Sequence, residues 1–202
     1  MCYNISMQNF QIETDKAINA LTGTQKPRLL LHSCCGPCSA YVLEYLTWHF
    51  SVTLLYYNPN IQPRQEYDLR LEHQLRLLAA FPQVALMPCG YDGTAYEETV
   101  RGLEREPEGG ARCEACFRLR LGYAARMAAE NGFDFFCTTL TVSPHKNAEL
   151  INALGRTLGE TYGVRWLPSD FKKREGYKRS ILLAEEYGLY RQNYCGCLYS
   201  KV

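Results

Sequence analysis

The chain has 202 residues, of which 47% are hydrophobic and 21% are charged, and its formal net charge is +1. This length and composition suit one sizeable folded domain, and the near-neutral charge gives no sign of a generally basic nucleic-acid binder. No apolar run approaches the ~20 residues of a membrane span. Residues 1–16 lack the basic flank and apolar stretch of a signal peptide, so we expect a cytoplasmic protein.

Predicted strands and helices alternate along the chain. We expect a helical lead-in over residues 1–27 and one α/β domain over residues 28–202. Apolar runs predict strands at 28–33, 51–58, 83–88, 133–141 and 164–168. Helical spacing predicts helices at 37–50, 63–81, 94–106, 113–131, 147–163 and 180–188, the third of them stopped by Pro107. The alternation predicts a single doubly wound, Rossmann-like parallel sheet with extra helices.

Seven of the ten cysteines fall into three closely spaced groups. These groups are Cys34, Cys35 and Cys38; Cys113 and Cys116; and Cys195 and Cys197. In an intracellular chain such clusters indicate metal or redox chemistry more often than structural disulfides. The first group follows the predicted strand at 28–33 and precedes a helix, so it lies at the C-terminal edge of the sheet. Ligands bind at that edge, and a helix N-terminus there favours thiolates.

The other three cysteines have different surroundings. Cys2 is close to the terminus and is assigned no role. Cys137 lies inside an apolar strand, where we expect it to act as a small buried hydrophobic residue. Cys89 follows a strand and is a weaker ligand candidate.

Three interpretations of the seven clustered cysteines stay open on spacing alone. Cys35-Gly36-Pro37-Cys38 matches the thioredoxin tetrapeptide, which would make the protein a thiol–disulfide oxidoreductase but leaves five cysteines without a role. A Cys₄ zinc site would stabilise an RNA-binding module and leave three cysteines over. A 4Fe–4S cluster also takes four thiolates, and the remaining three could then hold a second metal.

Five sequence blocks occur in order between Arg28 and Ser200: HSCCGPCS, YYNPNIQPRQEY, GARCEACFRLRL, TTLTVSPHKN and YRQNYCGC. In these blocks the sequence resembles the QueH-type epoxyqueuosine reductases, which are similar to the adenine-nucleotide alpha-hydrolase type of α/β fold. The resemblance implies reduction of epoxyqueuosine to queuosine at the wobble position of tRNA, the last step of queuosine biosynthesis. It also implies a 4Fe–4S cluster and an adjacent mononuclear iron, without cobalamin. Because cysteines replace the glycine- and serine-rich loop that ATP would need, no ATP use is expected.

The same resemblance assigns the metal ligands of a catalytic domain over residues 28–202. The cluster is expected on four cysteines: Cys34, Cys35, Cys113 and Cys116. The mononuclear iron, for which zinc could substitute, is expected on the other three: Cys38, Cys195 and Cys197. Some family members carry aspartate where Cys38 stands, and a softer thiolate would alter the potential or the identity of that metal.

Removing an epoxide oxygen requires two electrons and two protons. A metal with an open position could act as a Lewis acid on that oxygen while the cluster supplies electrons. A general acid must supply a proton, and the candidates near the matched blocks are Tyr91, Asp92, His145 and Tyr194. Asp92 fits equally well as a helix N-cap. His32, just before the cysteines, fits a hydrogen-bonded neighbour of the site better than a ligand.

A tRNA substrate requires basic and aromatic surface. Candidate contacts are Lys146, Arg191, Lys172, Lys173 and Arg174, together with Asn58, Asn60 and Gln62 after the second strand. Tyr190 and Tyr194 could stack on unpaired bases. The alternatives are a solvated charged face for the basic run and a simple turn for the amides. Since no flavin or nicotinamide motif is present, we expect an external electron donor.

Overall fold

The computed structural model describes residues 9–201 and contains one sheet of five parallel strands in the order β3-β2-β1-β4-β5. The strands are β1 (Arg28–His32), β2 (Ser51–Leu55), β3 (Ala85–Met87), β4 (Phe135–Thr138) and β5 (Arg165–Trp166). From the central β1 the chain first winds outward over β2 and β3, then crosses back to add β4 and β5 on the other side. The predicted doubly wound parallel sheet is confirmed.

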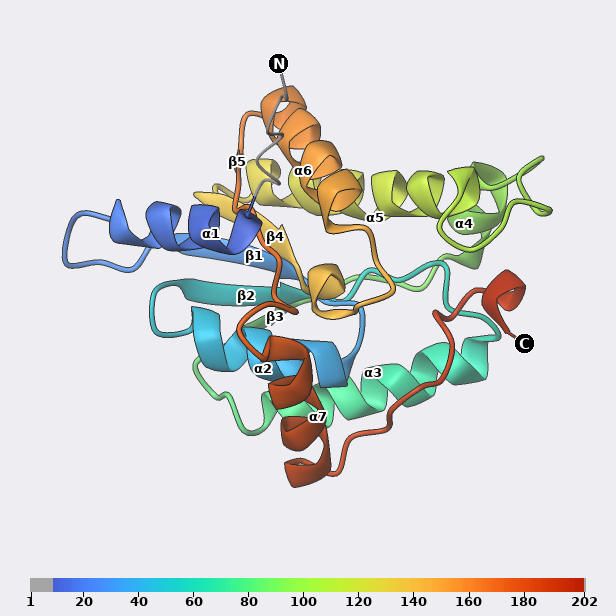
Figure 1. The fold of residues 1–202 in the computed structure, drawn as a ribbon, viewed down its shortest axis with the longest axis horizontal. Coiled ribbons are helices and arrows are strands. Elements are labelled where there is room, and N and C mark those ends of the chain that lie inside the picture. The colour runs from blue at the N-terminus through green and yellow to red at the C-terminus, as the bar shows by residue number, and fades with distance from the viewer. Residues whose placement is uncertain (1–8, 202) are drawn as a thin grey trace, which may run out of the picture.

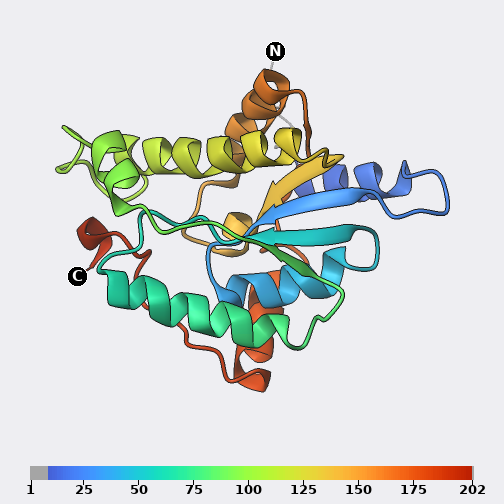
Figure 2. The same cartoon turned by 180° about the vertical axis from the view of Figure 1, so that it is seen from behind.

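Helices cover both faces of this sheet. They are α1 (Phe10–Asn19), α2 (Gly36–Leu46), α3 (Arg64–Leu78), α4 (Gly93–Thr99), α5 (Ala111–Glu130), α6 (Ala148–Tyr162) and α7 (Gly176–Glu186), with two 3-10 helices, η1 (Thr139–Val142) and η2 (Leu198–Ser200). Helices α5 and α6 lie on one face, and α2, α3 and α7 lie on the other (Figure 1). Figure 2 shows the same layers from behind. Helix α1 falls within the predicted lead-in, whereas residues 1–8, which include Cys2, lie outside the described residues.

Two hydrophobic clusters hold the helices against the sheet. Along β1, Leu29 and Leu31 belong to the cluster beneath α2, while Leu30 belongs to the cluster beneath α5. Successive strand residues point to opposite faces, and a strand buried on both faces is therefore a continuous apolar run. Each of these leucines is 0% exposed, and burying such a side chain contributes about 1.5–3 kcal/mol.

The helix predicted over 94–106 is wrong in length, because α4 ends at Thr99. Val100 follows as the C-cap, and Gly102 then adopts a φ of +84°, in the left-handed region that favours glycine. Gly102 therefore turns the chain before Pro107 is reached.

Other predicted boundaries are also wrong. The helix predicted over 37–50 ends at Leu46, and the strand predicted over 51–58 ends at Leu55. The strand predicted over 133–141 ends at Thr138, whose Oγ1 accepts a hydrogen bond from the Leu140 N–H at 3.2 Å and begins η1. The last helix begins at Gly176 rather than at Ser180, so part of the predicted basic loop is helical. Between residues 9 and 201 no helix is both long and apolar enough to cross a membrane.

Two helical glycines provide a test of the packing between α6 and β5. A Cβ at Gly155 would lie 2.3 Å from two ring atoms of Trp166, whereas one at Gly122 would meet only Leu158, at 3.7 Å. We expect Gly155→Ala to lower the free energy of unfolding by about 1–3 kcal/mol through overpacking. Gly122→Ala should raise it by about 0.5–1 kcal/mol through helix propensity. Denaturant unfolding of the metal-free variants measures both; equal effects would contradict the packing described here.

Candidate metal centre

The first cysteine group lies where the sheet changes its winding direction. β1 and β4 are neighbours, with His32 in register with Thr138, so the loops that follow them leave the same edge side by side. The Cys34 N–H donates to Thr139 Oγ1 at 3.0 Å, and the Thr139 hydroxyl donates to Cys34 Sγ at 3.2 Å. Such a switch point is the usual ligand site of an open parallel sheet.

Cys34, Cys35 and Cys38 form a tight sulfur triad. Their three Sγ atoms lie within 4.8 Å of one another, and those of Cys34 and Cys35 are 3.7 Å apart. Cys35 is the N-cap of α2, with Pro37 in the first turn, so the positive end of the helix faces these sulfurs. Hydrogen bonds from the Cys34 and Cys38 thiols lower the pKa of Cys35, which makes Cys35 the first of the triad to ionise.

The second and third cysteine groups come together beside this triad. Cys113 and Cys116 lie in the first two turns of α5, and Cys116 shares a buried cluster with Cys197 from the C-terminal segment. The Cys113 sulfur accepts a hydrogen bond from the Gly109 N–H at 3.2 Å. Burial raises the pKa of Cys116 to about 12, so a bound metal would have to displace its proton.

A buried arginine fixes the segment that carries Cys195 and Cys197. Arg70, on α3, pairs with Glu66 at 2.7 Å and donates to the Cys195 carbonyl at 3.1 Å. Gly196 has a φ of +123°, and a Cβ there would lie 3.0 Å from Ile61 Cγ1. This position therefore requires glycine, and the tight turn directs both neighbouring cysteines toward the rest of the site.

Two cations lie among the sulfurs. Lys146 Nζ is 3.1 Å from Cys195 Sγ and 3.1 Å from a Glu108 carboxylate oxygen. Arg120 Nη1 is 4.0 Å from Cys116 Sγ, and its Nη2 donates to Asn58 Oδ1 at 2.6 Å. Thiolates at these positions would therefore be stabilised by charge and by hydrogen bonds.

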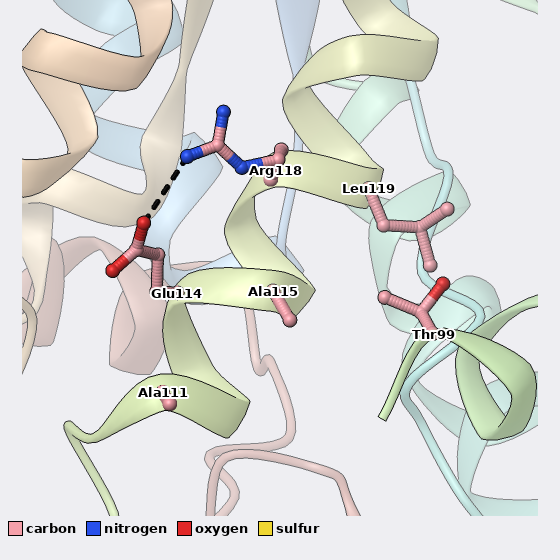
Figure 3. Close-up of a pocket in the computed structure, with 6 residues that line it drawn as sticks. All are labelled: Thr99, Ala111, Glu114, Ala115, Arg118 and Leu119. Carbon is pink, nitrogen blue, oxygen red and sulfur yellow. Dashed lines mark hydrogen bonds and ion pairs between the residues drawn. The ribbon is translucent and has the colours of Figure 1, made fainter. Parts of the chain in front are cut away.

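A cavity of about 650 Å³ opens over the sulfurs. Four cysteines line it: Cys34, Cys35, Cys38 and Cys195. Of the other residues predicted for the site, it brings together His145, Lys146, Arg191 and Tyr194, and it adds Tyr177 and Gln192. The cavity can hold a polar ligand against the triad. A second hollow, lined by Thr99, Ala111, Glu114, Ala115, Arg118 and Leu119, contains no sulfur; Figure 3 shows its Glu114–Arg118 ion pair.

Two of the four candidate acids lie away from the cavity. Asp92 is the N-cap of α4, where its Oδ1 accepts from the Thr94 N–H at 3.1 Å. A hydrogen bond from the Thr94 hydroxyl is the main cause of a lowered Asp92 pKa, so this carboxyl is ionised at neutral pH. The Tyr91 hydroxyl donates to the Ile61 carbonyl at 2.9 Å.

His32 is held as a neutral, hydrogen-bonded side chain behind the triad. Its Nε2 lies 3.1 Å from the Tyr57 carbonyl, which can only accept, so Nε2 carries the proton. Nδ1 is left to accept from the Thr138 hydroxyl at 2.8 Å. Burial lowers the His32 pKa to about 3. Both ring nitrogens are engaged within the protein, as expected of a neighbour rather than a ligand.

The amides after β2 are mostly internal. Asn58 and Asn60 are each 1% exposed, and Asn58 Nδ2 donates to the Ser33 carbonyl at 2.9 Å. Gln62 is partly exposed and its Nε2 donates to Glu97 at 2.9 Å. None of the three lines the cavity.

Two of the three residues of the basic run are held in ion pairs. Lys172 pairs with Asp170, and Arg174 pairs with Asp15. Lys172, Lys173 and Arg174 do not line the cavity.

The isolated cysteines within residues 9–201 lie outside the sulfur groups. Cys137 is 0% exposed and packs in the core, which confirms the prediction for it. Cys89 donates to the Tyr56 carbonyl at 3.2 Å.

Sequence reasoning missed Arg120, Thr139, Gln192 and Glu108. Arg120 follows Cys116 by four residues, which places both on one helix face, and this spacing was an available signal. Thr139 reaches Cys34, and Glu108 reaches Lys146 beside Cys195, only through the tertiary fold, and no local pattern marks them.

These features define a class of protein: a doubly wound α/β protein with a cysteine-rich, metal-competent site at the switch point of its sheet. Residues 29–202 match the family model described as "Epoxyqueuosine reductase QueH". The chain belongs to the QueH epoxyqueuosine reductase family.

Individual relatives agree with this membership. The chain is 46% identical to epoxyqueuosine reductase QueH of Streptococcus pyogenes, over 87% of this chain and 71% of that protein. It is 41% identical to the Staphylococcus epidermidis protein of the same name, over 96% of this chain and 87% of that one. Among solved structures, the U34-tRNA thiolase NcsA from Methanococcus maripaludis, which carries a 4Fe–4S cluster, matches with a TM-score of 0.56 and 15% identity. That match covers 96% of this chain and 69% of the thiolase, and it shows a shared fold.

The residues present fit an iron–sulfur group. Seven soft sulfur ligands lie in neighbouring groups, and hydrogen-bond donors reach them from Thr139, Gly109 and Lys146. Donors of this kind compensate the negative charge of metal-bound thiolates. Within residues 9–201 the triad is the one set of His, Cys, Asp and Glu side chains that meets the distance limits of a metal site.

Proposed function

We propose that this protein reduces epoxyqueuosine to queuosine in tRNA by two-electron removal of the epoxide oxygen. Membership in the QueH family supports this reaction. The observation that carries it is the gathering of seven cysteines from three distant segments at the sheet edge, where four of them line one cavity. The thiolase that shares this fold carries a 4Fe–4S cluster, which is consistent with a metal at this edge.

We assign a 4Fe–4S cluster to Cys34, Cys35, Cys113 and Cys116, and a single iron to Cys38, Cys195 and Cys197. Because the Cys38 sulfur lies within 4.8 Å of those of Cys34 and Cys35, a metal on Cys38 would be adjacent to the cluster. The rival division places one metal on the tight triad and the cluster on the other four sulfurs.

When bound, these groups supply one-electron transfer and Lewis acidity. The chain's own residues bind the substrate over the triad, restrict water in the cavity and deliver a proton. His145 lies on the cavity wall and is exposed, so it can exchange protons with solvent. The Tyr194 hydroxyl already donates to the Gln62 carbonyl at 3.2 Å. We therefore assign His145 as the general acid.

The tRNA contacts follow the rim of the cavity. Arg191 is exposed there and can pair with phosphate, and Tyr177, 38% exposed, offers a ring for stacking. Lys146 faces Cys195 and Glu108 instead, so we assign it to the stabilisation of a thiolate at Cys195 rather than to tRNA binding. An external donor supplies the two electrons that removal of the epoxide oxygen consumes.

The experiment that tests this function is anaerobic reconstitution followed by metal analysis and assay. We expect about five irons and about four sulfides per chain, as one cluster plus one iron requires, and conversion of epoxyqueuosine-containing tRNA with a chemical reductant. Zinc without sulfide, even after reconstitution, would contradict the proposal and favour a zinc-stabilised RNA binder. Disulfide reduction by a metal-free protein would favour a thiol–disulfide oxidoreductase.

Single cysteine variants distinguish the two divisions of ligands. We expect Cys195→Ala to retain about four sulfides and lose one iron, because Cys195 is assigned to the single iron. Cys34→Ala should lose the sulfides, because Cys34 is assigned to the cluster. Cys89→Ala is the matched control and should keep the wild-type content. The opposite pattern, with sulfide lost from the Cys195 variant alone, would establish the rival division.

Variants of the candidate acids test the proton donor. His145→Gln should lower kcat on epoxyqueuosine-containing tRNA by about 10²-fold or more, because general acid catalysis contributes about 10²–10⁴-fold. Asp92→Ala should leave kcat unchanged and cost about 1 kcal/mol of stability through the lost N-cap. Single-turnover kinetics and denaturant unfolding measure the two effects. A wild-type rate for the His145 variant would rule out this assignment.

A further inference from the structure

Arg120 is a buried arginine without a carboxylate partner. Its side chain is 2% exposed, and between residues 9 and 201 no aspartate or glutamate forms an ion pair with it. Its Nη2 donates to the neutral Asn58 amide, and its Nε has no hydrogen-bond partner. Because an uncompensated buried charge is strongly destabilising, this guanidinium requires an anion nearby.

The two other buried arginines are held by different partners. Arg70 has Glu66 at 2.7 Å as its counter-charge. Arg112 donates to two backbone carbonyls in the loop before α5 and stacks over Tyr199 at 4.8 Å. Of the three, only Arg120 lines the cavity over the sulfurs.

The sulfurs around Arg120 come from all three cysteine groups. Its Nη1 is 4.0 Å from Cys116 Sγ, and Cys34 and Cys195 also act on it electrostatically. Arg120 lines the cavity together with Cys34 and Cys195. Whatever the cysteines bind therefore has this positive charge beside it, shielded from solvent.

Asn58 holds the guanidinium in place. Its Oδ1 accepts from Arg120 at 2.6 Å, and its Nδ2 donates to the carbonyl of Ser33, the residue before Cys34. The same amide thus ties α5 to the first cysteine loop. Movement of Arg120 away from the sulfurs would break this link.

We propose that Arg120 is a positioning residue that raises the reduction potential of the metal centre through its fixed positive charge. Reduction adds one negative charge to the centre, and a nearby cation stabilises the reduced form more than the oxidised form. The attraction is large because burial removes the screening of water. This role rests on the proposed function, since it requires a redox-active cluster on these cysteines.

The test is an EPR-monitored redox titration of the reconstituted protein. We expect Arg120→Gln to shift the midpoint potential to a more negative value. Arg120→Lys, which keeps the charge, should restore most of the wild-type potential. Arg118→Gln is the matched control, because Arg118 lies on the same helix but is exposed and paired with Glu114. It should titrate like the wild type.

Each outcome decides the role of Arg120. A cluster-loaded Arg120→Gln protein at the wild-type potential would overturn it, as would an Arg120→Lys variant shifted as far as the glutamine variant. If Arg120→Gln does not retain a cluster, Asn58→Asp replaces it, because a carboxylate there neutralises the guanidinium without removing it. A negative shift in that variant supports the role, and a wild-type potential overturns it. A wild-type protein that holds no cluster would instead contradict the proposed function itself.

Discussion

The parallel pairing of β1 with β4 is the constraint on which the site depends. These strands are adjacent in the sheet but far apart in the sequence, and their register brings the loops after His32 and Thr138 together. The contact between Cys34 and Thr139 follows directly from that register. A slip of one residue would turn the buried leucines of β1 to the wrong faces. Core packing therefore fixes the position of the first sulfurs.

The sequence predicts the parts of the molecule that repeat a local pattern. Leu29, Leu30 and Leu31 signal a strand buried on both faces, and the alternation of strands with helices leaves few topologies besides a doubly wound sheet. The lengths of individual elements are harder to predict. The turn at Gly102 overrides the helical pattern that continues past it, and the Thr138 hydroxyl begins a 3-10 helix within an apolar run.

The candidate site residues also divide into those that a local pattern predicts and those that only the tertiary fold brings together. The spacing of the cysteines identifies them as a set, because two sulfurs on one helical turn or beside a glycine are local features. The partners of those sulfurs are not local: Lys146 reaches Cys195, and Arg120 reaches Asn58, only after the sheet has formed. From the sequence, Asn58 is a candidate substrate contact because its side chain is polar. In the structure it is buried and its amide donates to the Ser33 carbonyl.

The docked segment around Gly196 has a consequence for the order in which the protein matures. Its sulfurs take their places only when Arg70 and Ile61, both on or near α3, are already positioned to receive the turn. Cys34 and Cys35 leave the ribosome long before Cys195 and Cys197. A nascent chain therefore exposes the first cysteine group before the other cysteines of the site have been synthesised. On the ligand assignment proposed above, metal insertion would follow formation of the sheet, and a fully loaded centre would show that both ends of the domain have folded onto each other.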